Sequence, residues 1–159
     1  MRYIYFYDSL LGRYALEETG EALTRLWVGD RVSLVPAGAE IKETPLIREA
    51  HNQLEAYFSG KLCFFSLPLF PRGTEFQVRV WNELQKIPYG ETITYGELAC
   101  RIGNSKASRA VGMANGRNPL PVFIPCHRVV GAHGKLVGYT GGLDIKIKLL
   151  QLEKVYLDL

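Results

Sequence analysis

Cysteine, histidine and long apolar runs are all scarce in this chain, and each shortage excludes a class of protein. The 159 residues include three cysteines and three histidines. The cysteines form neither a CxxC pair nor a disulfide framework, so we expect a protein of the reducing cell interior. We also expect no metal site, zinc included. No apolar run approaches the roughly 20 residues of a membrane span, and the N-terminus reaches Asp8 too early for a signal peptide. A cytoplasmic, prokaryote-like protein without a membrane partner is therefore expected.

Acidic residues are missing from one long stretch. Residues 1–60 carry six Lys/Arg and nine Asp/Glu, whereas residues 101–143 carry no acid at all. The basic residues of that stretch are Arg101, Lys106, Arg109, Arg117, Arg128 and Lys135. This pattern is typical of a polyanion-binding surface, because attraction to phosphate is the sequence-independent part of nucleic-acid binding. The alternative is a solvated face that acids elsewhere in the fold balance.

The apolar patterns predict an α+β fold in two domains. Residues 1–70 indicate an N-terminal α/β domain with an antiparallel sheet and one helix. Its strands are expected over residues 3–7, 13–16 and 22–28, with an edge strand over residues 64–70. The helix is expected to have Thr44 as N-cap and Pro45 in its first turn, and to stop at Gly60. Residues 71–73 form the expected linker.

Residues 74–159 are predicted to form a mostly helical second domain. Thr74 and Gln77 have the spacing of a capping box, in which each residue satisfies a backbone N–H at the start of a helix. Thr94 and Glu97 repeat that spacing. The sequence therefore predicts that one helix begins after Thr74 and another after Thr94.

Two short helices are expected within and beside the acid-free stretch. The first ends at Ile102, and after a glycine-containing turn the second spans residues 106–115. Short helices joined in this way are typical of a helix-turn-helix. Residues 118–124 contain two prolines, so a loop or an extended run is expected there, and residues 143–152 form an expected closing helix.

The segment Ile124–Gly131 places a thiol beside an imidazole. Cys126 stands next to His127 and after Pro125, whose fixed φ stiffens the chain before the thiol. Sulfur attacks as the thiolate, and a neighbouring histidine is a common means of forming one. Buried inert cysteines are nevertheless common, so the pair taken alone favours a small core residue. It indicates a nucleophile only in combination with its surroundings.

Three segments in order supply that combination. They are Thr94–Ala99, then Ser108–Gly112 with Asn118 and Pro119, then Ile124–Gly131 followed by Gly138–Gly142. With these motifs in register, residues 74–155 resemble the O6-alkylguanine-DNA alkyltransferase family, whereas the N-terminal half fits only in general shape. The resemblance implies a ribonuclease H-like N-terminal domain, a winged helix-turn-helix C-terminal domain and a monomer.

The activity that the resemblance implies is DNA repair by direct transfer. An alkyl group on O6 of guanine, and also on O4 of thymine, would move irreversibly to Cys126, so that each molecule acts once. The partner would be double-stranded DNA carrying the lesion, bound through its minor groove, with the damaged base flipped out of the stack. No cofactor is implied.

The resemblance also assigns roles at the reacting centre. Cys126 is the expected alkyl acceptor, and His127 the base, which acts through a bridging water. Glu153 is expected to orient the imidazole, as the third member of a triad does. Asn118 is expected to support the thiol, and Tyr95 to protonate the departing base. Without the resemblance, Glu153 would be an exposed helix-terminal carboxylate, Asn118 part of an Asn-Pro turn, and Tyr95 a core aromatic.

Contacts to DNA and to the base are expected from a second set of residues. Arg109 matches a finger that fills the gap left in the base stack by the flipped nucleotide. The other expected DNA-binding residues are Ser105, Lys106, Ala107, Ala110, Arg117 and Arg128. The guanine pocket is expected to be lined by Tyr95, the main chain of Val129, Tyr139 and Thr140.

Three other functions fit parts of the pattern. A non-catalytic alkyltransferase-like protein would bind the same lesions, but such proteins replace the acceptor cysteine, and Cys126 argues against one. A winged-helix DNA-binding regulator would use the helix-turn-helix and leave Cys126 and His127 without a purpose. A cysteine hydrolase would need an oxyanion hole, for which no motif is visible.

Overall fold

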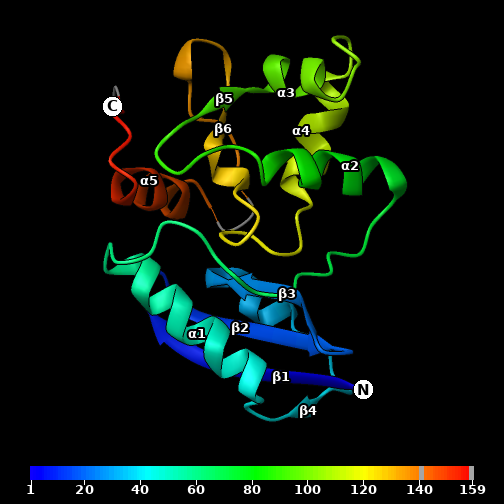
Figure 1. The fold of residues 1–159 in the computed structure, drawn as a ribbon, viewed down its shortest axis with the longest axis vertical. Coiled ribbons are helices and arrows are strands. Elements are labelled where there is room, and N and C mark those ends of the chain that lie inside the picture. The colour runs from blue at the N-terminus through cyan, green and yellow to red at the C-terminus, as the bar shows by residue number, and fades with distance from the viewer. Residues whose placement is uncertain (140–141, 158–159) are drawn as a thin grey trace. The chain divides into compact units, whose positions relative to one another are not determined.

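The computed structural model describes residues 1–139 and 142–157 of an α+β protein (Figure 1). The chain divides into two compact units, Met1–Arg72 and Gly73–Leu159. Within the described part of the chain, no helix has both the length and the apolar character of a membrane span.

The first unit is built on a four-stranded sheet of order β3-β2-β1-β4. Strands β1 (Arg2–Ser9), β2 (Gly12–Thr19) and β3 (Ala22–Val28) form an antiparallel meander. Strand β4 (Glu40–Ile41) lies parallel to β1 on its other side, and the 3-10 helix η1 (Gly29–Leu34) follows β3. The three strands predicted over residues 3–7, 13–16 and 22–28 are thereby confirmed.

Helix α1 (Pro45–Phe58) covers one face of this sheet (Figure 1). It begins as predicted, because the Thr44 side chain accepts the Ile47 N–H at 3.1 Å. It ends before Gly60, whose φ of +77° suits a residue without a Cβ. The buried side of the helix consists of Ile47, Ala50, Leu54 and Tyr57.

Residues 64–70 do not form the predicted edge strand. Only Leu69 makes a bridge to the sheet, parallel to Leu23 of β3. The Leu23 N–H donates to the Pro68 carbonyl at 2.9 Å, and the Phe70 N–H donates to the Leu23 carbonyl at 2.8 Å. Pro68 has no N–H of its own, so the ladder cannot extend past it.

The second unit is mostly helical. Helix α2 (Glu75–Leu84) begins with the capping box of Thr74 and Gln77, in which both reciprocal hydrogen bonds are present. Helix α3 (Tyr95–Arg101) has Thr94 as its N-cap, and helix α5 (Leu143–Leu152) has the predicted bounds. Trp81 joins α2 to helix α4 (Ser108–Gly116), because its indole N–H donates to the Ala114 carbonyl at 2.8 Å.

Helices α3 and α4 form the predicted pair, but α4 starts two residues later than expected. The Lys106 N–H donates to the Asn104 side-chain oxygen at 3.1 Å, and the Ala107 N–H donates to the Asn104 carbonyl at 3.0 Å. These bonds hold Lys106 and Ala107 in the turn, since an Asx turn competes with helix formation. The connection therefore keeps Lys106 outside the helix.

A short parallel pair brings two distant segments of the second unit together. Strand β5 (Ile93–Thr94) pairs with β6 (Val129–Val130), with Ile93 opposite Val129. Tyr95 follows β5 directly, and the 3-10 helix η2 (Cys126–Arg128) directly precedes β6. The pairing therefore brings Tyr95 to the segment that carries Cys126.

The chain turns tightly on either side of η2. Residues 118–124 form a loop, one of the two predicted forms: Pro121 bridges to Ile124, and Val122 between them has a φ of +75°. After β6, the Gly131 N–H donates to the Lys135 carbonyl at 2.7 Å around the 3-10 helix η3 (Ala132–Gly134). A compact turn therefore follows β6.

Candidate active site

Cys126 lies at the start of η2 with only 1% of its surface exposed. Its N–H donates to the Ile124 carbonyl at 2.7 Å, and the Arg128 N–H donates to the Pro125 carbonyl at 3.1 Å. These bonds are consistent with the predicted stiffness of the backbone that carries the thiol. The thiol is therefore held in a fixed position that solvent hardly reaches.

Polar groups from separate segments converge on the Cys126 thiol. The Asn118 amide, the Lys146 ammonium and the Tyr139 hydroxyl all lie close enough to the sulfur to favour its thiolate form. Tyr95 lies close enough for a thiolate at Cys126 to help raise the pKa of its hydroxyl, for which burial is the larger cause. Four residues that are far apart in the sequence thus surround one sulfur.

Asn118 is fixed by the turn that precedes the thiol. Its Nδ2 donates to the Ile124 carbonyl at 2.8 Å, and its Oδ1 accepts the Leu120 N–H at 2.9 Å. Both ends of the amide therefore hold the backbone between Leu120 and Ile124. This is the arrangement expected for a residue that organises the turn and supports the thiol.

The resting form of Cys126 is the neutral thiol. Burial raises its pKa to about 11, although Asn118, Lys146 and Tyr139 each lower it in part. At neutral pH nearly all molecules therefore carry S–H. A reaction through this sulfur must form the thiolate when the partner is already in place.

Lys146 is a component of the site that sequence reasoning missed. Its side chain is fully buried, and its Nζ donates to the carbonyls of Val129 at 2.7 Å, Val137 at 3.0 Å and Gly138 at 3.3 Å. Burial lowers its pKa to about 8, against the charge of a Cys126 thiolate, which raises it. One signal was available: Lys146 stands three residues before Leu149, in phase with the apolar face of α5.

Glu153 is buried at the end of α5, with 2% of its surface exposed, so the exposed helix-terminal carboxylate is excluded. Its Oε2 accepts from His127 Nε2 at 2.7 Å and from Arg128 at 2.9 Å. Its Oε1 accepts from Arg128 Nε at 2.9 Å and from the Gly90 N–H at 3.1 Å. A bidentate arginine–carboxylate pair and an imidazole therefore share one carboxylate.

His127 has a defined tautomer because of this carboxylate. A carboxylate only accepts hydrogen bonds, so Nε2 must carry the proton that faces Glu153. Burial lowers the pKa of His127, with the bond to Glu153 opposing it, and the ring is neutral at neutral pH. The remaining nitrogen, Nδ1, holds the lone pair that can take a proton.

Arg128 is not a DNA-binding residue, contrary to the prediction. Only 7% of its surface is exposed. It pairs with Glu153 and donates to the Ile87 carbonyl at 2.7 Å, and its guanidinium lies 5.8 Å from the centre of the Tyr89 ring. For this one cation of the acid-free stretch, the balancing acid does lie elsewhere in the sequence.

The other basic residues of the helix-turn-helix lie at the surface. Ser105, Lys106, Arg109, Ala110 and Arg117 are exposed. Within residues 1–139 and 142–157, no ion pair joins Lys106, Arg109 or Arg117 to an acid. Ala107, which was also predicted to contact DNA, is buried at the start of α4, so its side chain is not available for such a contact. Thr140, predicted to line the pocket, lies outside the described residues.

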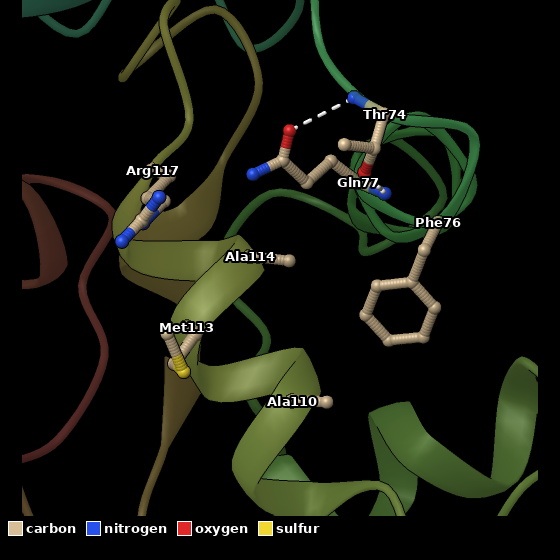
Figure 2. Close-up of a pocket in the computed structure, with 7 residues that line it drawn as sticks. All are labelled: Thr74, Phe76, Gln77, Ala110, Met113, Ala114 and Arg117. Carbon is tan, nitrogen blue, oxygen red and sulfur yellow. Dashed lines mark hydrogen bonds between the residues drawn. The ribbon is translucent and has the colours of Figure 1, made fainter.

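A shallow groove of about 200 Å³ runs beside α4. Figure 2 shows Ala110 and Ala114 of α4 pointing toward Phe76 and the capping box of α2. Met113 and Arg117 complete the α4 side of the groove. Ala110 is exposed and small, so another surface can come close to the backbone of α4 at this residue.

Residues 75–155 match the family model described as 6-O-methylguanine DNA methyltransferase, DNA binding domain. A methylated-DNA–protein-cysteine methyltransferase of Methanosarcina acetivorans is 52% identical over 153 residues, which cover 95% of this chain and 97% of that protein. The chain belongs to this methyltransferase family. A constitutive methylated-DNA–protein-cysteine methyltransferase of Bacillus subtilis is 43% identical over 162 residues, covering 98% and 97% of the two chains.

The same family provides a close structural relative. The crystal structure of Mycobacterium tuberculosis OGT in complex with DNA has a TM-score of 0.89 and 46% sequence identity, and the match covers 96% of this chain and 92% of that one. The family resemblance predicted from the motifs is therefore confirmed. In this member of the family, the matched region contains Cys126, His127, Asn118, Tyr95 and Glu153.

Replacing Glu153 with Gln should strongly destabilise the protein. The change leaves the Arg128 guanidinium buried without its counter-charge, which typically costs about 3–5 kcal/mol. The free energy of unfolding in urea measures the loss. Glu83→Gln is the matched control, because its 3.1 Å pair with Lys86 involves a largely exposed partner and should cost less than about 1 kcal/mol. Equal losses in the two variants would contradict a buried role for Glu153.

Alkylation of Cys126 by iodoacetamide should speed up as pH rises, because the thiolate is the reactive form and its pKa is about 11. The exposed Cys63 and Cys100 are first replaced by Ser. Between pH 7 and 8 the rate should rise about tenfold per unit. Above pH 8 the slope should fall, since Lys146 with a pKa of about 8 loses its charge. Lys146→Met should react more slowly at pH 7 and keep the full slope; identical profiles would contradict the coupling.

Proposed function

We propose that this protein repairs DNA by moving an alkyl group from O6 of guanine to its own Cys126 in a single, irreversible turnover. The observation that carries the proposal is the buried thiol, held by Asn118 and surrounded by Tyr95, Tyr139 and Lys146. Membership of the methyltransferase family supports the same chemistry. O4 of thymine is proposed as a second position of attack.

The transfer balances without a cofactor. The Cys126 sulfur attacks the saturated alkyl carbon, a C–S bond forms, and the C–O6 bond breaks with its electron pair passing to the base. The base then leaves as neutral guanine if it gains a proton. The Tyr95 hydroxyl is the proposed proton donor, and the thiol proton must pass to a base of the protein.

His127 is the proposed acceptor of the thiol proton. Glu153 fixes its ring and tautomer and favours the imidazolium that forms, while Arg128 keeps Glu153 ionised. Because His127 is neutral at rest, its Nδ1 can take the proton, and a bridging water is proposed between it and the sulfur. Lys146 would stabilise the thiolate for as long as the base is bound.

The helix-turn-helix is the proposed DNA-binding surface. Helix α4 exposes Arg109, and Arg117 is exposed directly after its last residue. The turn before α4 exposes Ser105 and Lys106, and the whole stretch is without acids. We propose that α4 lies in the minor groove, where its small residue Ala110 permits close approach. Arg109 would occupy the gap in the base stack while the damaged nucleotide is flipped into the pocket of Tyr95, Val129 and Tyr139.

Finer features of the fold and of the molecule belong to the same proposal. The N-terminal domain would be ribonuclease H-like, and the C-terminal domain, from about residue 74, would be a winged helix-turn-helix that carries both DNA binding and alkyl transfer. The protein would act as a monomer in the cytoplasm. A non-catalytic lesion-binding role is the alternative, and the presence of Cys126 in a prepared site argues against it.

Incubation with duplex DNA carrying O6-[³H]methylguanine should label the protein with one methyl group per chain. Cys126→Ser should remain unlabelled, because its hydroxyl is a far weaker nucleophile. Cys63→Ser and Cys100→Ser are matched controls that remove the exposed thiols and should keep full labelling. Label that persists in Cys126→Ser would show that another residue is the acceptor.

Arg109→Ala should slow transfer from duplex lesions by roughly 10- to 100-fold at saturating DNA, because the cost of unstacking a base is a few kcal/mol. Reaction with free O6-benzylguanine should stay within about twofold, since no base must be extruded. Arg117→Ala removes the same charge from the C-cap of the same helix and should weaken only DNA affinity, by the loss of a phosphate contact. An equal loss on duplex and free base would refute the finger role of Arg109.

A further inference from the structure

Asn115 is a buried polar residue of α4. Only 5% of its surface is exposed. One turn earlier, Gly112 lies against Tyr95, since a Cβ at Gly112 would stand 3.7 Å from the ring. Residues three apart share a helix face, so Asn115 lies on the side of α4 that meets Tyr95.

The Asn115 amide joins the two parts of the reacting centre. Its Nδ2 donates to the Cys126 carbonyl at 3.3 Å. Burial raises the pKa of the Tyr95 hydroxyl, and the nearby Asn115 amide acts in the opposite direction. A carbonyl can only accept, so the NH₂ end must face Cys126 and the orientation of the amide is defined.

The other end of this amide is an acceptor that the protein leaves unused. Asn115 Oδ1 is buried, and no donor among residues 1–139 and 142–157 reaches it. A buried acceptor without a donor typically costs about 1–3 kcal/mol, so its presence in a native site calls for an explanation. Asn118, the other asparagine beside the thiol, has partners at both ends.

We propose that Asn115 Oδ1 is a specificity-determining acceptor for an N–H of the flipped base. The proposal rests on the function proposed above, in which the base enters beside Tyr95 and Cys126. The amide that carries this oxygen donates to the Cys126 carbonyl through Nδ2 and acts on the Tyr95 hydroxyl. A ligand that brings an N–H to this point would donate to Asn115 Oδ1 and form a hydrogen bond that the protein does not make by itself.

The chemistry of the base identifies the donor. In an O6-alkylguanine, N1, N3 and N7 are all acceptors, and the only N–H groups are those of the 2-amino group. An O4-alkylthymine in DNA has no N–H at all. Asn115 therefore selects guanine lesions over thymine lesions, because an unmatched base leaves the buried oxygen without a donor.

The test removes the Asn115 amide from the protein and, separately, the 2-amino group from the base. Single-turnover methyl transfer to Cys126 is measured on duplexes with O6-methylguanine or with O6-methylhypoxanthine, which lacks only the 2-amino group. The wild-type protein should react roughly 10- to 100-fold faster with the guanine. In Asn115→Leu, which removes the acceptor at similar volume, this ratio should fall about tenfold, and the preference over O4-methylthymine should fall with it.

The ratio separates recognition from general damage to the site. Asn118→Ala is the matched control: it should slow both substrates equally and leave the ratio at the wild-type value. A merely structural role for Asn115 would do the same, so an unchanged ratio in Asn115→Leu overturns the proposal. Should Asn115→Leu not fold, Asn115→Ala makes the same comparison, and equal wild-type rates on the two bases also overturn it.

Failure of this inference is distinguishable from failure of the proposed function. If wild-type protein moves no methyl group from O6-methylguanine to Cys126, the function itself is wrong. If it transfers the group but the guanine-to-hypoxanthine ratio is the same with and without the Asn115 amide, only the acceptor role is wrong.

Discussion

The buried carboxylate of Glu153 is the constraint on which the rest of the site depends. It accepts from His127, from two nitrogens of Arg128 and from the Gly90 N–H, so four donors share two oxygens. Those donors come from the loop after α2 and from η2, while the carboxylate ends α5. Gly90 has a φ of +80°, and a Cβ there would meet the Glu153 carbonyl at 3.3 Å, so the loop needs glycine at this point. One ion pair thus fixes the position of the segment that carries the nucleophile.

A buried ion pair is weak evidence for net stability, because desolvation of the charges offsets much of their attraction. Its effect here is on geometry and protonation. Glu153 gives His127 one tautomer, and Arg128 supplies the counter-charge of the carboxylate. Lys146 supplies a positive charge that acts on the thiol. It also donates to three carbonyls, that of Val129 in β6 and those of Val137 and Gly138 after it. The site therefore combines a neutral base, a neutral thiol and a nearby cation, all arranged before a substrate arrives.

Local signals in the sequence predicted the local structure, and non-local contacts account for what was missed. Apolar patterns predicted β1 to β3, and the caps at Thr44, Thr74 and Thr94 predicted the helix starts, because each feature depends on residues close by. The three motifs in register predicted the family and, through that resemblance, the residues of the reacting centre. Arg128 was placed on the DNA surface because its partner Glu153 lies in another element, 25 residues on. Lys146 and Asn115 were overlooked for the same reason, since their partners are carbonyls and side chains that only the fold brings near. The predicted edge strand over residues 64–70 is not formed, because Pro68 has no backbone N–H to donate to the sheet.

The burial of Cys126 fits a protein that can react only once. A thiol with a depressed pKa would be mostly thiolate at neutral pH, and that form also reacts with oxidants and with stray electrophiles. A protein that regenerates its nucleophile can tolerate some such losses, whereas here each loss would remove a molecule. Burial raises the pKa of Cys126 to about 11 and keeps the sulfur protonated, while Asn118, Tyr139 and Lys146 stand ready to favour the thiolate. The same low-dielectric surroundings that suppress reactivity in the free protein strengthen these contacts once a base excludes the remaining water. Burial therefore both protects the Cys126 thiol in the free protein and strengthens the contacts that form its thiolate when the base is bound.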